Sequence, residues 1–356
     1  MSRTAGYLAV TSTGQLISLS ISREPAVEYL RAGSNDETRM ASTSVNRCAM
    51  ELVQTLLDSP EKFKVGISTL ETGTTLIDAG IDFKGGFLAG KLIGEICMGG
   101  LGTVELTSLE IGDMRISGVQ VTTDHPLVAC VLSQLAGWPV KIGRSRALGS
   151  GPARALAQVE DLYDEYPYED DHSEGVLVME TSKRPDARLS RQVSGKCGIS
   201  PADLYIIVTP TSSPAGVVQI CSRVVETGMH KMHSLGIGLD QIVSGTGSCP
   251  VPPISQSDLE MMGRTNDAIL YGGMASYLFA GIEGIAEKLE STPSSSSPDY
   301  GKPFLRLFEE AGRDFYKLDR GLFSPASVQI NDRRTGELRR YGKISPEILR
   351  NSFGII

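Results

Sequence analysis

Residues 204–235 read LYIIVTPTSSPAGVVQICSRVVETGMHKMHSL. The apolar run Leu204–Val208 predicts a buried strand, and the loop Thr209–Gly216 that follows is rich in Thr, Ser, Pro and Gly. Helical spacing of apolar residues then predicts one long helix from Val217 to Leu235, which Gly236 ends. A strand, a loop and a helix in this order are typical of α/β folds, in which sites lie at the carboxyl ends of strands.

The helix predicted over 217–235 has two different faces. At about 100° per residue, its apolar face carries Val217, Cys221, Val224, Gly228, Met232 and Leu235. Its opposite face carries Gln219, Arg223, Glu226, His230 and His233. Arg223 and Glu226 stand three positions apart and are therefore neighbours. They form either an ordinary ion pair on a solvated face, which stabilises little, or part of a site beside the strand end.

His230 and His233 have a spacing that would put two metal ligands on one helical face. Neither a cysteine nor a carboxylate is placed to supply a third ligand, so the pair is weak evidence for a metal site. The six cysteines of the chain are scattered, and none has C-x-x-C spacing. We therefore expect no metal.

Strand and helix patterns alternate along much of the chain, which favours an α/β fold or α+β layers. Ser44 caps a helical pattern, and from Gly175 the rhythm is strand, helix, strand, helix. We expect two domains with a substrate cleft between them. Residues 1–43 would be an extension outside the core, 44–165 the first domain and 166–356 the second, with a C-terminal hairpin able to pack on the first. The acidic segment Asp161–Asp171 at this boundary is interpreted as a solvated loop.

Composition excludes several classes of protein. The 356 residues carry a formal charge of -8, so nucleic acid is an unfavourable partner. No apolar run approaches the roughly 20 residues that a membrane span requires, and the N-terminus lacks the pattern of a secretion signal. Scattered cysteines indicate reduced, mostly buried thiols. We expect a cytoplasmic protein.

A second glycine-rich loop precedes another helical pattern. In Gly149-Ser150-Gly151-Pro152, backbone amides could converge on an anion at the helix start, and Arg154 could add a charged donor. The alternative is a turn that reverses the chain. The spacing is neither that of a dinucleotide fingerprint nor that of a P-loop, so redox cofactors and nucleotide hydrolysis are disfavoured.

Two polar clusters lie beside glycines further along the chain. They are Thr265-Asn266-Asp267 and Asp299-Tyr300-Gly301-Lys302-Pro303. Asn and Asp side chains offer the paired donors and acceptors that read the edge of a heteroaromatic ring. Taken alone, each cluster is more often a helix cap or a turn.

Together these segments resemble the methenyltetrahydromethanopterin cyclohydrolase family. The matching stretches run in order from about Ser44 to the C-terminus. They are EICMGGLG (95–102), TDHP (123–126), GSGPARALA (149–157), YEDD (168–171), RVVETGMHKMH (223–233), GRTNDAILYGG (263–273), DYGKPF (299–304), FYKLD (315–319), LFSPASVQIND (323–332) and SFG (352–354).

The resemblance implies a homotrimer of two-domain α/β subunits with the pocket between the domains, and no metal or redox cofactor. It implies interconversion of the cationic 5,10-methenyl and N5-formyl forms of tetrahydromethanopterin, the one-carbon carrier of methane-producing archaea, or of its dephospho form in methylotrophic bacteria. The family's catalytic arginine and glutamate fall on Arg223 and Glu226. The residues expected to bind substrate are Asp124, His125, Gly149, Ser150, Gly151, Arg154, Thr265, Asn266, Asp267, Tyr300 and Lys302.

The chemistry suits the arginine–glutamate pair. Water must attack the methenyl carbon and lose a proton, which a carboxylate at Glu226 can accept, while Arg223 favours the ionised form of that carboxylate. Two rivals stay open: a non-catalytic pterin-binding protein, and a metal-dependent amide or amidine hydrolase that uses His230 and His233. Residues 1–43 depart from the family, and Met40 is an alternative start.

Overall fold

The computed structural model describes residues 43–142 and 145–355. All but Thr43 of the expected N-terminal extension 1–43 lies outside these residues. Within them the chain forms two six-stranded sheets with helices between and beside them, which confirms the mixed α/β class. No helix of the described part is long and apolar enough to cross a membrane.

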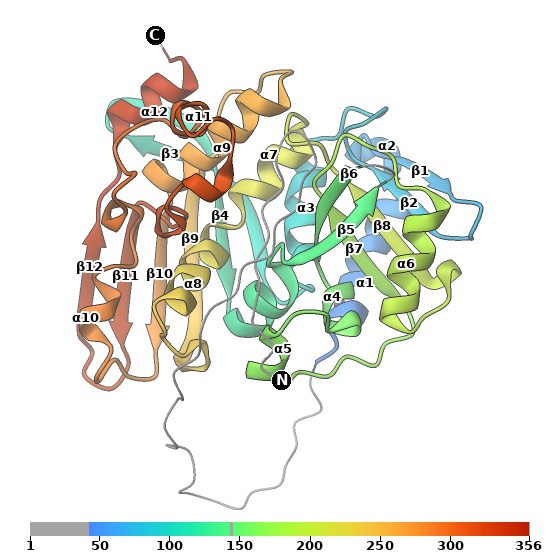
Figure 1. Cartoon of the computed structure of the whole chain (residues 1–356), viewed down its shortest axis with the longest axis horizontal. Helices are drawn as coiled ribbons and strands as arrows, with labels where there is room; N and C mark the ends of the chain where they lie inside the picture. Colours follow the sequence, from blue (N-terminus) through green and yellow to red (C-terminus); the bar gives the residue numbers. More distant parts are fainter. Residues whose placement is uncertain (1–42, 143–144, 356) are drawn as a thin grey trace, which may run out of the picture.

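The first sheet has the strand order β1-β2-β8-β7-β6-β5 (Figure 1). Its centre, β2, β8 and β7, is parallel, and the outer pairs are antiparallel. Because β7 and β8 are parallel, their carboxyl ends meet at the same edge. The bounds are Gly66–Thr69 (β1), Thr75–Asp78 (β2), Trp138–Ile142 (β5), Ser145–Ser150 (β6), Gly175–Met179 (β7) and Leu204–Val208 (β8).

The second sheet has the order β12-β11-β10-β9-β4-β3, and only its β10–β11 pair is parallel. One face packs on helices, while β3 and β12 leave many residues exposed on the other. The bounds are Thr103–Ile111 (β3), Met114–Thr123 (β4), Ile242–Pro250 (β9), Met274–Phe279 (β10), Ser327–Asp332 (β11) and Leu338–Gly342 (β12).

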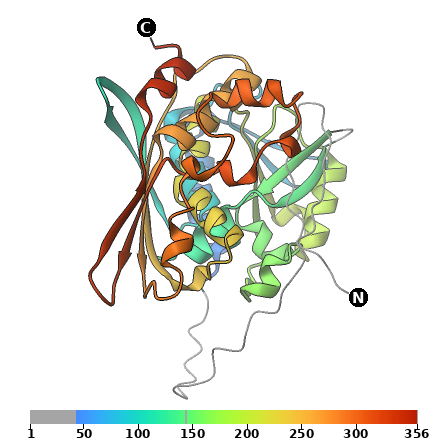
Figure 2. The same ribbon diagram turned by 60° about the vertical axis from the view of Figure 1, so that its left-hand side comes forward.

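The α-helices complete the layers. Figure 2 shows helices between the two sheets, while α6, together with the short α4, packs on the far face of the first sheet. Their bounds are Val45–Asp58 (α1), Pro60–Phe63 (α2), Phe87–Cys97 (α3), Ala153–Ala157 (α4), Leu162–Glu165 (α5), Ala187–Cys197 (α6), Pro214–Cys221 (α7), Val224–Ser234 (α8), Asp258–Gly272 (α9), Ala286–Leu289 (α10), Phe304–Glu310 (α11) and Pro346–Phe353 (α12).

The centre of the first sheet is apolar on both faces, as expected for buried parallel strands. Val178 and Ile207 pack with α1 and α3, while their neighbours Leu177 and Ile206 pack with α6. On the second sheet, the inner face forms one core with α7, α8 and α9. These helices therefore hold the two sheets together and carry the segment between β8 and β9.

The sheets do not follow the division expected at residues 165 and 166. β5 and β6 of the first sheet precede this point, and β7 and β8 follow it; in the second sheet β3 and β4 precede it, and β9 to β12 follow. Each sheet therefore contains strands from both sides of this point in the chain. The C-terminal hairpin β11–β12 does form, and it belongs to the second sheet.

The prediction of one helix over 217–235 was wrong. The chain forms α7 and α8, separated by a turn at Ser222 and Arg223. The Ser222 hydroxyl donates to the carbonyl of Gln219 (2.6 Å), and the Arg223 amide donates to Ile220 only three residues back (3.0 Å). Such local side-chain bonds compete with the helical ladder, and periodicity alone does not reveal them.

The acidic segment Asp161–Asp171 is not a solvated loop throughout. The Asp170 carboxylate accepts bonds from the start of α1, and the Tyr168 hydroxyl donates to the carbonyl of Thr43 (2.6 Å). The Tyr163 hydroxyl donates to the carbonyl of Leu132 (2.5 Å). Three interleaved tyrosines were the signal that this segment packs against the core, because aromatic rings bury a large apolar area.

Other local predictions are confirmed. Ser44 caps α1 and accepts from the amide of Arg47. β1 and β2 form an antiparallel hairpin. The apolar segment before Trp138 forms a π-helix, η1 (Leu127–Gln134), and Trp138 begins β5. None of the six cysteines forms a disulfide, and all but Cys48 are buried. Short 3-10 turns, η2 to η6, cover Pro201–Asp203, Leu239–Gln241, Ser294–Ser296, Phe315–Lys317 and Arg320–Leu322.

Candidate active site

Arg223 and Glu226 lie where α7 gives way to α8. Arg223 immediately precedes the first residue of α8, and Glu226 is in its first turn. The Arg223 Nε atom lies 3.4 Å from Glu226 Oε2, and the two side chains are 11% and 6% exposed. The N-terminus of a helix stabilises a negative charge in its first turn. The sequence prediction that these two side chains are neighbours is therefore confirmed, but they are not on a solvated face.

Arg223 is held by contacts from outside its helix. Its Nη2 donates to the backbone carbonyl of Gln134 at the end of η1 (2.5 Å), and its Nη1 donates to the Ser150 hydroxyl at the end of β6 (3.2 Å). The Ser150 hydroxyl in turn donates to the same Gln134 carbonyl (2.5 Å). Two elements distant in sequence, η1 and β6, thus fix the planar fork of donors beside Glu226.

The electrostatics favour Glu226 as a proton acceptor. Burial raises the pKa of its carboxyl, and the charges of Arg223 and then Arg154 oppose that rise. A general base works best when its pKa approaches the working pH, because it is then both ionised and basic. A buried carboxylate with a raised pKa beside a fixed cation is a common sign of a functional site.

The placement of α8 depends on a close contact at Gly228. A Cβ atom built on this residue would lie 2.0 Å from the hydroxyl of Tyr277 on β10. That hydroxyl donates to the carbonyl of Val225 (2.7 Å). Gly228 therefore lets the helix approach the second sheet closely enough for Tyr277 to anchor the turn that carries Glu226.

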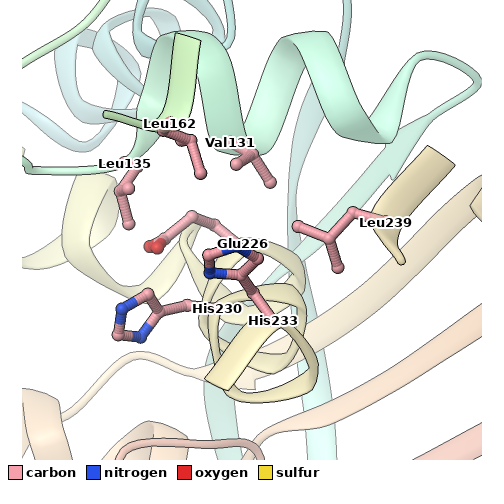
Figure 3. A pocket seen from close by; sticks show the side chains of 7 residues that line it. All are labelled: Val131, Leu135, Leu162, Glu226, His230, His233 and Leu239. Carbon is pink, nitrogen blue, oxygen red and sulfur yellow. The ribbon is translucent and has the colours of Figure 1, made fainter. Parts of the chain in front are cut away.

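Glu226 also forms the wall of a small pocket (Figure 3). His230 and His233 extend from the same helix, and apolar side chains from facing elements close the space. The volume open to the centre of a water molecule is about 10 Å³, which is roughly room for one water. The lining residues are Val131, Leu135, Leu162, Glu226, His230, His233 and Leu239.

The loop expected to bind an anion is built differently from the prediction. Gly149 and Ser150 belong to β6, and the amide of Gly151 donates to the carbonyl of Ser133 (2.9 Å). Arg154 is fully buried; it pairs with Glu160 (2.5 Å) and donates to the carbonyls of Val131 and Ser133. The charged donor expected for an anion is thus engaged inside the protein, and Ser150 is the member of the loop that reaches Arg223.

Asp124 and His125 lie at the loop between β4 and η1. Both are exposed, and the Ser244 hydroxyl donates to Asp124 (2.8 Å) while the amide of His125 donates to the Thr123 hydroxyl (3.0 Å). The loop leads into η1, which lines the Glu226 pocket through Val131. Their exposure leaves both side chains accessible to a ligand.

The other predicted binding residues have partners within the protein. Thr265 and Asn266 donate to carbonyls one turn earlier in α9, and the Tyr271 hydroxyl holds the segment of Tyr300 and Lys302 by bonding the Gly301 amide and the Lys302 carbonyl. Tyr300 stacks obliquely on Tyr271, and Lys302 pairs with Glu310. These contacts match the cap-and-turn alternative of the sequence.

Asp267 is a buried carboxyl between α9, α11 and α12. It accepts from the Phe304 amide (2.8 Å) and the Ser352 hydroxyl (2.5 Å). Burial, only partly offset by these two bonds, raises its pKa to about 7. Between about pH 4 and 7 the folded protein therefore keeps a proton on Asp267 that the unfolded chain has lost, so this residue stabilises the fold at low pH and loses that contribution as the pH rises towards 7.

Asp267→Asn is expected to remove that dependence, because an amide has no proton to release in this range. The melting temperature of wild type should fall more than that of the variant between about pH 5 and 8. Thermal unfolding of both proteins at the two pH values measures the difference. Parallel curves would show that Asp267 titrates normally in the folded state.

Two contributors to the site were missed in the sequence. The backbone carbonyl of Gln134 binds Arg223, and Glu165 contacts His233 at 2.8 Å. A backbone acceptor has no sequence signal, and Glu165 is one of many acidic residues in its segment. Within the described residues, no three His, Cys, Asp or Glu side chains gather where they could hold a metal ion.

Comparisons with known proteins identify the family of the chain. The family model Cyclohydrolase (MCH) matches residues 44–353. The chain is 41% identical over 317 residues to the methenyltetrahydromethanopterin cyclohydrolases of Methanococcoides burtonii and Methanosarcina mazei, covering 88% of this chain and 98% of each relative. The same enzyme of Methanocaldococcus jannaschii is 41% identical over 87% of this chain. The chain therefore belongs to the methenyltetrahydromethanopterin cyclohydrolase (MCH) family.

Proposed function

We propose that this chain is a methenyltetrahydromethanopterin cyclohydrolase of one-carbon metabolism, which interconverts the 5,10-methenyl and N5-formyl forms of the carrier or of its dephospho form. The observation that carries the proposal is the buried Arg223–Glu226 pair at the start of α8. It lies inside a stretch matched from end to end by the family and by relatives of that name.

The reaction begins at the methenyl carbon, which lies between two nitrogens that share a positive charge. Water attacks this carbon, and Glu226 accepts the proton that the water loses. The carboxylate also stabilises the cation beside it. Arg223, fixed by Ser150 and Gln134, keeps Glu226 ionised and oriented. Cleavage of the bond to N10 then leaves the formyl group on N5.

The substrate cleft is part of the proposal. We place it between the two sheet-and-helix units, next to the turn that joins α7 to α8. Ser150 supports this placement through its bond to Arg223, and the exposed Asp124 and His125 are accessible for contact with the carrier. The other predicted binding residues have their described polar contacts within the protein, and they would then act through the shape of the cleft. They are Gly149, Gly151, Arg154, Thr265, Asn266, Asp267, Tyr300 and Lys302.

The assembly and location remain part of the same proposal. The family resemblance suggests a homotrimer that works in the cytoplasm with the pterin carrier as its partner and no cofactor. Exposed apolar side chains near β1 and α3 offer a surface for subunit contact: Ile67, Phe83, Phe87 and Leu88. The particle mass in solution tests the trimer.

The deciding experiment follows the loss of the methenyl chromophore with a methanopterin carrier and, separately, with a folate carrier. We expect turnover with the methanopterin form. Binding without turnover would favour the non-catalytic rival. Activity that disappears with a chelator and returns with added metal would favour a metal-dependent hydrolase, whereas full activity in the metal-free protein removes that rival.

A further inference from the structure

Hydrolysis of a methenyl cation releases one proton in each turnover, if the proposed function holds. The cation and water combine to a neutral carbinol, with a new C–O bond, while one O–H bond of the water breaks and its proton goes to Glu226. Collapse of the carbinol then breaks the C–N10 bond and forms the formyl C=O bond. The carbinol hydroxyl loses one proton and N10 gains one, so this step causes no net release of protons. The proton on Glu226 must therefore leave before the next cycle.

Glu226 has little direct access to solvent, because its side chain is only 6% exposed. The pocket beside it holds about one water by volume. Sites that accept a molecule the size of a drug or a pterin have roughly 300–1,000 Å³, so this pocket cannot hold the carrier. Its size and its single carboxylate suit a bridging water and the movement of a proton.

His233 is the group in this pocket that also reaches outward. Its side chain is 20% exposed, and its Nε2 lies 2.8 Å from the carboxylate of Glu165, which is 49% exposed. Tyr166 lies against the His233 ring, with ring centres 6.2 Å apart, and accepts from the amide of Leu239. Glu165 thus orients the imidazole and gives it a polar partner on the solvent side.

Glu165 also borders a second, open hollow on the surface. The volume of this hollow is about 500 Å³. It is lined by Leu127, Val128, Leu132, Glu165, Tyr166, Pro167, Tyr168, Gly238 and Asp240. The Glu165–His233 pair therefore stands between the closed pocket of Glu226 and a hollow wide enough for bulk water.

His230 lies in the same pocket, but it is a poor carrier. Burial lowers its pKa to about 4, and the charges of His233 and Arg320 add to that effect. An imidazole this acidic holds a proton only weakly near neutral pH. Of the two histidines, the geometry favours His233, and the lowered pKa of His230 counts against His230.

We propose that His233, oriented by Glu165, carries the proton from Glu226 through one water to the solvent-filled hollow. His233 is then a positioning and relay residue for the proposed hydrolysis, and Glu226 keeps its role as the acceptor from water. The route uses no metal ligation by His230 and His233.

The test is buffer rescue of His233→Ala. In dilute, non-imidazole buffer, kcat for methenyl hydrolysis should fall about tenfold or more, since a positioned acid–base group is lost. Added imidazole should restore it in a concentration-dependent way, whereas wild type should not respond. His233→Gln keeps a polar side chain of similar reach and should show the same loss without a folding defect, judged by circular dichroism and particle size.

His172→Ala is the matched control, because His172 also faces a glutamate, Glu174 at 3.6 Å, and is 23% exposed, but does not line the pocket. It should keep wild-type kcat and show no buffer dependence. Unchanged kcat in both His233 variants, or a loss that imidazole does not rescue, overturns the relay. Absence of turnover in wild type itself overturns the proposed function instead, so the two failures are distinct.

Discussion

Glu226→Gln is expected to lower the rate of methenyl hydrolysis by about 10²-fold or more. Glutamine keeps the size and one acceptor of the side chain, but it cannot take the proton of the attacking water or offer a negative charge to the cation. Because Glu226 is buried beside Arg223, the substitution also leaves that guanidinium without its carboxylate. Binding of the carrier should change much less, so the loss should appear in kcat.

The matched control is Glu260→Gln. Glu260 is also in the first turn of its helix and pairs with an arginine, Arg264, at 2.5 Å, but it is 40% exposed. It should stay within about threefold of wild type, as exposed pairs contribute little. A folded Glu226→Gln protein, intact by circular dichroism and particle size, that turns over within threefold of wild type would exclude Glu226 as the base.

Arg154→Met is expected to reduce the free energy of unfolding by about 3–5 kcal/mol. The guanidinium is completely buried, and its partner Glu160 is only 12% exposed. Its removal leaves a carboxylate without a counter-charge and takes donors away from the carbonyls of Val131 and Ser133. A buried group that loses its partner costs its full desolvation. Denaturant unfolding followed by circular dichroism measures the change.

Arg306→Met serves as the comparison for that experiment. Arg306 also pairs with a glutamate, Glu310, at 3.0 Å, but the two side chains are 69% and 45% exposed. Its substitution should change stability by less than about 1 kcal/mol. If Arg154→Met were equally mild, Arg154 would be available for another role, and the anion-binding interpretation of its loop would regain support.

The sequence predicted best those features that depend on nearby residues. The strand Leu204–Val208, the cap at Ser44 and the hairpins follow from side-chain alternation and turn chemistry. The prediction that Arg223 and Glu226 are neighbours is confirmed, although the single helix on which it was based is two helices. Three positions across the start of a helix still bring two side chains together.

Features that depend on distant residues could not be predicted in this way. Nothing near His233 points to Glu165, 68 positions away. Arg154 and Glu160 are only six positions apart, but their burial depends on distant elements, such as the one that supplies the carbonyls of Val131 and Ser133. The break in the helix at Ser222 is a local feature that was also missed, because periodicity does not reveal that the Ser222 hydroxyl donates to the carbonyl three residues back. The pairing of strands from both sides of residue 165 has no local signal either, since it is decided by neighbours in space.

The interleaved order of the strands has a consequence for synthesis of the protein. β4 is complete at residue 123, but its inner neighbour β9 begins only at residue 242. At about 5–20 residues per second, the ribosome needs roughly 6–24 seconds to make the intervening chain. During that time Val119 and Val121, both fully buried in the finished protein, lie on the β3–β4 hairpin without the later elements that bury them. The nascent chain therefore exposes an apolar surface of β4 to chaperones before the second sheet, on which the helix of Glu226 packs, is complete.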